Sequence, residues 1–204
     1  MIICGIDFSI NSTALVINNS EKFLFYSFVP NYTPTLKAFK FHKKMEDLGL
    51  IKIISYQKQQ GDKDPIKDQK IKLSNAEALS AKVIEVLEKY KNEPIEFRIE
   101  GFSYSSSGSS FIDLIIYNTF LKSKLVTLFG VNSINVIAPK TNKKIYTGNG
   151  NANKCQMIRK FIEEDSLLSN FIKEEGFIKE EDFTIPKPLD DLVDAYALTV
   201  IKIS

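Results

Sequence analysis

The sequence contains no tryptophan, a single histidine and two cysteines, and these shortages exclude several classes of site. Cys4 and Cys155 lie far apart and belong to no Cys/His set, so the ligand spacing of a structural zinc site is absent. Because His42 is the only histidine, serine–histidine–aspartate or cysteine–histidine catalysis would need His42 itself. The lysines around His42 favour a surface position instead. Carboxylates therefore remain as the candidates for catalysis.

Long apolar runs and arginines are also scarce. No apolar run approaches the roughly 20 residues that a membrane span needs, and no basic leader precedes the first apolar strand. We therefore expect a soluble protein of a reducing, cytoplasm-like compartment. Arg98 and Arg159 are the only arginines and the net charge is +2, so phosphate contacts would be made mostly by lysines.

The 204 residues are enough for one domain with a full hydrophobic core. Two segments, 30–73 and 165–187, lack a clear pattern and are interpreted as insertions, although 51–56 is strand-like. The remaining pattern predicts strands at 2–6, 13–17, 22–29, 95–100 and 133–138, and helices at 78–90, 110–129, 152–164 and from Pro188 onward. The helix at 78–90 is expected to begin with a capping box at 74–77. An early antiparallel hairpin followed by alternating helices and strands predicts a mixed α/β sheet flanked by helices.

Four carboxylates stand where such a fold could bring them together. Asp7 and Glu100 each end an apolar strand, and Asp191 and Asp194 are three residues apart on one helix face. Taken singly, Asp7 suits a turn, and the Asp190-Asp191 pair suits the start of a helix. Asp194, a full turn into the helix and flanked by apolar residues, is harder to explain in this way. Asp190 is an alternative to Asp191, because it too is a helical neighbour of Asp194.

Carboxylates that lie close together repel one another, and a bound cation would neutralise them. Mg²⁺ and Mn²⁺ prefer hard oxygen ligands. Two such ions about 4 Å apart can activate a water and stabilise the leaving oxygen of a phosphodiester, so no histidine is required.

Four blocks of the sequence resemble RuvC-type Holliday junction resolvases, which belong to the RNase H-like superfamily. Gly5-Ile6-Asp7 with the strand at 13–17 resembles their first hairpin. Glu100 with its following loop and long helix is similar to their second carboxylate block. Residues 148–154 resemble a G-x-G-x-A-x-K segment, and 191–198 a D-x-x-D-A-x-A-[LI] ending. The blocks keep the family's order over residues 1–18 and 95–204.

The resemblance implies an RNase H-like α/β domain with a five-stranded mixed sheet and the activity of a crossover junction endodeoxyribonuclease. It implies two Mg²⁺ ions, replaceable by Mn²⁺, held by a set of four ligands: Asp7, Glu100, Asp191 and Asp194. Lys154 would join the catalytic site as a contact to the scissile phosphate. The implied partners are four-way branched DNA and a second copy of the chain. Lysine-rich compact versions look most like phage-encoded members, which would act in an infected bacterium.

Further DNA contacts are expected around this site. The lysines Lys140, Lys143 and Lys144 precede Lys154 in an expected basic loop. A solvated loop that does not contact DNA would give the same sequence pattern. Phe102 and Tyr104 follow Glu100 and could stack on unpaired bases or pack beneath their loop.

Two other functions stay open. One is an RNase H-like nuclease acting on RNA or RNA–DNA hybrids. The other is a non-catalytic scaffold of the same fold that binds branched DNA.

Overall fold

A computed structural model of the chain describes residues 1–102, 108–164, 166–176 and 183–202. Its centre is a six-stranded sheet in the order β4-β3-β2-β1-β5-β6. The strands are β1 Ile2–Asp7, β2 Thr13–Asn18, β3 Phe23–Pro30, β4 Lys52–Tyr56, β5 Ile95–Glu100 and β6 Ile134–Ile137. Strands β1, β2 and β3 pair antiparallel, whereas β4, β5 and β6 each pair parallel with a neighbour. The predicted mixed α/β sheet is thereby confirmed.

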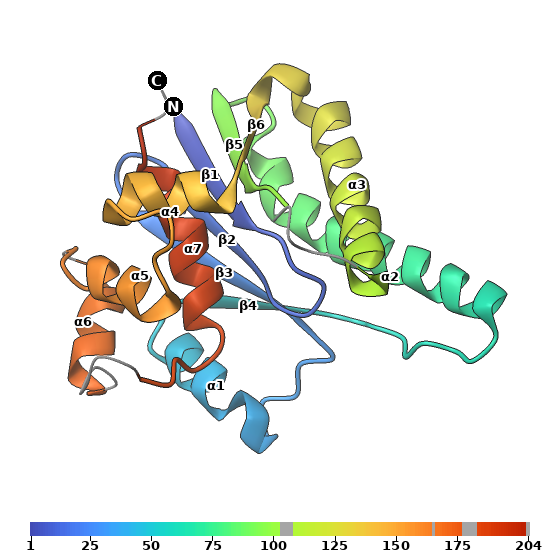
Figure 1. Ribbon diagram of the computed structural model, residues 1–204, viewed down its shortest axis with the longest axis horizontal. Helices are drawn as coiled ribbons and strands as arrows, with labels where there is room; N and C mark the ends of the chain where they lie inside the picture. Colours follow the sequence, from blue (N-terminus) through green and yellow to red (C-terminus); the bar gives the residue numbers. More distant parts are fainter. Residues whose placement is uncertain (103–107, 165, 177–182, 203–204) are drawn as a thin grey trace.

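Helices cover both faces of the sheet (Figure 1). They are α1 Lys40–Asp47, α2 Pro65–Leu87, α3 Ser109–Phe129, α4 Pro139–Thr147, α5 Lys154–Phe161, α6 Leu167–Glu174 and α7 Leu189–Val200, with 3₁₀ turns at Lys37–Phe39, Glu88–Tyr90 and Val131–Ser133. Two hydrophobic cores result. One joins α2 and α3 to the sheet through residues such as Leu79, Phe97 and Leu121. The other joins the face under α7 to α5 and α6 through residues such as Val16 and Phe161. Within the described ranges, no helix is both long enough and apolar enough to span a membrane.

The sheet has one strand more than the five predicted. The additional strand β4 comes from segment 30–73, where the strand-like stretch 51–56 lies. It pairs with β3 at the edge of the sheet, with Tyr26 opposite Lys52. The insertion therefore extends the sheet by one strand.

The predicted start of the helix at 78–90 was wrong, because α2 begins thirteen residues earlier at Pro65. Asp64 is its N-cap, and the Asp64 carboxylate accepts hydrogen bonds from the backbone N–H groups of Ile66 and Lys67 at 2.9 and 3.4 Å. The buried stripe of α2 begins only at Asn75. The first turns are largely exposed, so they show no hydrophobic periodicity, and the sequence pattern missed them.

Three further expectations need correction. The stretch that holds Lys140, Lys143 and Lys144 is helix α4 rather than a loop, because Pro139 occupies its first turn. Segment 165–187 contains helix α6, which begins after a capping box at Ser166. His42 is only 6% exposed, because its side chain lies on the inner face of α1 with the rings of Tyr32 and Phe39 beside it.

Arg98 ties the last helix to the sheet. It is buried on β5, and its guanidinium donates to the carbonyl oxygens of Leu198 and Ile201 at 3.1 and 2.7 Å. These carbonyls belong to the C-terminal end of α7, where intrahelical partners are missing. The Glu96 carboxylate accepts from the same guanidinium at 2.8 Å. The end of α7 is thereby fixed over β5.

Candidate active site

Two carboxylates lie at the same edge of the sheet, where neighbouring parallel strands end. Asp7 is the last residue of β1, and Glu100 is the last residue of β5. The register places Ile6 opposite Ile99, so the next residue on each strand is one of the two carboxylates. The structure thus brings Asp7 and Glu100 together.

Helix α7 brings the remaining acidic residues to this edge. It packs across β1 and β2 and carries Asp190, Asp191 and Asp194 in its first half. The approach is close, because a Cβ added at Gly5 of β1 would overlap the carbonyl oxygen of Ala195. Small residues on both elements therefore let the helix carry its carboxylates onto the strand ends.

The acidic side chains are near enough to affect one another's ionisation. Burial raises the pKa of Asp7 well above its usual value. Three carboxylates raise the pKa of Asp7 further, in the order Glu100, Asp191 and Asp194. Burial, and then the charge of Asp194, raises the pKa of Glu100 to about 7. Burial raises the pKa of Asp194 to about 6. Four predicted residues from three elements therefore form one electrostatic cluster.

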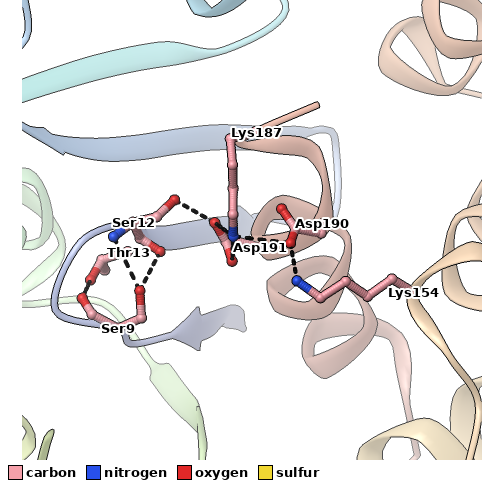
Figure 2. Close-up of polar contacts among 7 residues, drawn as sticks. All are labelled: Ser9, Ser12, Thr13, Lys154, Lys187, Asp190 and Asp191. Carbon is pink, nitrogen blue, oxygen red and sulfur yellow. Dashed lines mark hydrogen bonds and ion pairs between the residues drawn. The ribbon is translucent and has the colours of Figure 1, made fainter. Parts of the chain in front are cut away.

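A lysine contacts two acidic residues in the first turn of α7, as Figure 2 shows. The Lys187 ammonium contacts both carboxylate oxygens of Asp191, at 2.7 and 2.8 Å, and the Oδ2 atom of Asp190 at 2.9 Å. The Ser12 hydroxyl, from the turn between β1 and β2, donates a hydrogen bond to Asp191 Oδ2. Burial, and then the charge of Asp190, still raises the pKa of Asp191 despite these contacts.

Asp190 is in a different electrostatic state from the other four. Its Oδ2 atom is bound by the ammonium groups of both Lys154 and Lys187, as Figure 2 shows. Burial opposes ionisation, but these two hydrogen bonds lower the pKa of Asp190 overall. Asp190 therefore has its countercharges within the protein, whereas Asp7, Glu100 and Asp194 repel one another.

The donor chemistry of the cluster fits a hard divalent cation, since four repelling carboxylates gain most from a shared positive charge. In the present conformation, no three His, Cys, Asp or Glu side chains of the described residues are gathered tightly enough to share one ion. The Asp191 carboxylate is instead held by the Lys187 ammonium and the Ser12 hydroxyl. Ion binding would thus require these side chains to rearrange.

The basic residues expected to contact DNA lie beside the cluster. Lys143 is close enough to Glu100 and Asp194 to counter the rise in their pKa values. Lys140 and Lys144 are exposed on the same helix, α4.

The two expected aromatic contacts differ in what the structure describes. Phe102 is half-buried and packs edge-on against Phe111, with ring centroids 5.6 Å apart. The Lys122 ammonium lies 5.1 Å from the centroid of the Phe102 ring. Phe102 was expected either to stack on unpaired bases or to pack beneath its loop, and the structure shows it packed against α3. Tyr104 lies outside the described residues.

Three polar residues of the site were missed by the sequence analysis. Lys187 ends a segment without a periodic pattern, and Ser12 lies in the short turn between β1 and β2. Asn142 is buried on α4, its amide donates to the Asp194 backbone oxygen at 3.3 Å, and it lies near enough to Glu100 to lower the pKa of that carboxyl. One sign of the role of Asn142 was present in the sequence, namely a polar residue at a position that faces the core from a short helix.

The raised pKa values predict a pH dependence of stability in the absence of divalent ions. The unfolded chain releases the Glu100 proton near its ordinary pKa of about 4.3, whereas the folded chain keeps it to about 7. Stability is therefore lost as the pH rises through this window, and the unfolding free energy should be lower at about pH 8 than at about pH 5. Denaturant unfolding in chelator measures this decline, which should be smaller in Glu100→Gln. Equal declines in the two proteins would contradict the assignment.

Comparisons with known proteins give only structural neighbours. No protein-family profile and no curated protein sequence matches the chain. A solved RuvC structure from Thermus thermophilus aligns with a TM-score of 0.49 and 14% identity, over 98% of this chain and 92% of that chain. The T. thermophilus RuvC in complex with a Holliday junction substrate aligns with a TM-score of 0.47 and 18% identity, over the same shares.

Proposed function

We propose that this protein is a divalent-metal-dependent endodeoxyribonuclease that cuts four-way junctions or other branched DNA. The observation that supports it is the meeting of carboxylates from two strand ends and one helix: Asp7, Glu100, Asp191 and Asp194. The mutual repulsion of these carboxylates would be relieved by a bound cation. The lysines of α4 and α5 beside them would bind the phosphate of a phosphodiester. The resemblance of the four sequence blocks to RuvC-type resolvases supplies the choice of branched DNA.

In this proposal the four carboxylates hold Mg²⁺ or Mn²⁺, two ions per site. The bound ions would supply the charge that activates a water and stabilises the leaving oxygen. In the hydrolysis, the water oxygen forms a bond to phosphorus and the P–O3′ bond breaks, which leaves 5′-phosphate and 3′-hydroxyl ends. Asn142, whose side chain lies near enough to lower the pKa of Glu100, would orient the Glu100 carboxylate in this site.

Lysines supply the remaining contacts to DNA. Lys154 is the first residue of α5, at the end of a helix whose free N–H groups favour anions. Lys143 lies beside Glu100 and Asp194, where a phosphate approaching the carboxylates would meet it. Lys140 and Lys144 would contact the backbone farther along α4, and Tyr104 would lie at the branch point.

The assembly belongs to the same proposal. Resolution of a two-fold symmetric junction needs two symmetric nicks, which a homodimer provides. Each chain would be a single nuclease domain, and the lysine-rich compact form would place it among the phage-encoded resolvases.

A substrate panel tests the proposal. Labelled four-way, three-way and linear DNA and an RNA–DNA hybrid are incubated with the full chain and Mg²⁺, with EDTA as the control. We expect metal-dependent cutting of branched DNA and at least about tenfold slower cutting of linear DNA. If only the RNA–DNA hybrid is cut, the resolvase proposal is wrong and an RNase H-like activity takes its place. If the junction is bound but not cut, the protein is a non-catalytic scaffold that binds branched DNA.

A further inference from the structure

Lys187 is held at the site by the segment that precedes α7. The backbone N–H of Leu189 donates to the Pro186 carbonyl oxygen at 3.0 Å. Phe183 and Ile185 pack against the core under α7, and the Phe183 carbonyl oxygen accepts from the Cys155 thiol at 3.4 Å. The Lys187 side chain is 51% exposed, but its ammonium ends on two buried carboxylates. The fold therefore fixes the backbone of Lys187 within reach of both carboxylates.

Asp190 can hold this lysine without help from Asp191. It is 5% exposed, and only one of its carboxylate oxygens, Oδ2, is used by Lys154 and Lys187. The other oxygen, Oδ1, is buried and has no hydrogen-bond partner in the described structure. A buried carboxylate oxygen in this state can accept a further donor at little cost.

We propose that Lys187 is a resident cation of the carboxylate cluster, which competes with the divalent ion for Asp191, and that Asp190 retains Lys187 when the ion binds. Asp190 is then a positioning residue, and Asp191 is the ligand. The inference rests on the metal site of the proposed function. It assigns opposite effects to two neighbouring charges, Lys187 weakening and Asp190 strengthening the binding of the ion.

The charges that face Lys187 agree with this arrangement. Asp190 and Asp191 face it from α7, and Asp7 is influenced by its charge from β1. His42 on α1 is also near enough for the Lys187 charge to lower its pKa, after the larger effect of burial. A second cation placed among these groups would be repelled by Lys187. Movement of the ammonium toward Asp190 relieves that repulsion.

The test is Mn²⁺ binding to the full chain without DNA, measured by titration calorimetry. Lys187→Met should bind Mn²⁺ about three- to tenfold more tightly than wild type. The substitution removes the ion pair between the half-exposed Lys187 ammonium and the Asp191 carboxylate, so Asp191 is free to bind the ion. Lys187→Arg should bind as wild type does. Lys173→Met, on the exposed side of α6, is the matched control and should change nothing. Unchanged or weaker binding by Lys187→Met would overturn the proposal, as would a lack of Mn²⁺ binding by every variant.

A double-mutant cycle separates a positioning role of Asp190 from ligation. Asp190→Asn should weaken Mn²⁺ binding in the wild-type chain, because Lys187 then pairs with Asp191 alone. In the Lys187→Met chain, the same change should have less than about a twofold effect. Equal weakening in both chains would make Asp190 a ligand and overturn the proposal. If DNA cutting fails in the substrate panel while this cycle behaves as expected, the nuclease proposal falls and the competition stands.

Discussion

Asp7→Asn is expected to lower the rate of branched-DNA cutting at saturating Mg²⁺ by at least about a thousandfold. Asp7 is the central carboxylate of the cluster, since Glu100, Asp191 and Asp194 all affect its ionisation. The amide keeps the shape of the side chain but removes the negative charge that would hold an ion. Single-turnover cleavage of a labelled four-way junction measures the loss.

The same substitution should stabilise the protein when no divalent ion is present. Burial and three neighbouring carboxylates oppose the charge of Asp7, so an uncharged side chain removes repulsion. Melting in chelator should therefore occur at a higher temperature for Asp7→Asn than for wild type. Loss of activity together with gain of stability distinguishes a functional carboxylate from a structural one.

Asp62→Asn is the matched control, because Asp62 is exposed in the segment before α2. It should leave both the cutting rate and the metal-free melting temperature unchanged. Cutting by Asp7→Asn within about tenfold of wild type would remove Asp7 from the site.

The strand-end carboxylates could be found from sequence because a local rule and a topological rule agree. An acidic residue at the end of an apolar strand is conspicuous, and the ends of parallel neighbours meet at one edge. Asp7 and Glu100 satisfy both rules, and the register of β1 and β5 places them together. The choice between Asp190 and Asp191 depended on helical spacing alone. The structure separates them electrostatically, because Lys154 and Lys187 neutralise Asp190.

The features that sequence analysis missed share the absence of a periodic pattern. The first turns of α2 project from the body and are exposed, so only the Asp64 cap and Pro65 mark them. The segment before α7 is irregular, and the importance of Lys187 arises from tertiary contacts with α7 rather than from its neighbours in sequence. His42 was placed on the surface because of adjacent lysines, but helical geometry turns it inward on α1. Local composition does not determine which face of a short helix is buried.

Gly5→Ala is expected to have the largest effect on stability, a loss of about 2–4 kcal/mol in the free energy of unfolding. An added Cβ would overlap the Ala195 carbonyl oxygen and lie 2.9 Å from the Thr199 Cγ2 atom. The obstacle is mainly helix backbone, so relief requires α7 to move away from β1. That movement would also draw Asp191 and Asp194 away from Asp7, and cutting should fall together with stability.

The comparison that isolates this close approach is Gly61→Ala. At Gly61 an added Cβ would meet only the Asp68 side chain, whose Oδ1 atom would lie 2.7 Å away and can move. For a chain of this size, a loss of 2–4 kcal/mol corresponds to a fall of roughly 4–16 °C in the melting temperature. Gly61→Ala should melt within about 2 °C of wild type. If Gly5→Ala does the same and keeps its cutting rate, α7 can shift without cost, and the close packing of helix and strand does not set the geometry of the carboxylates.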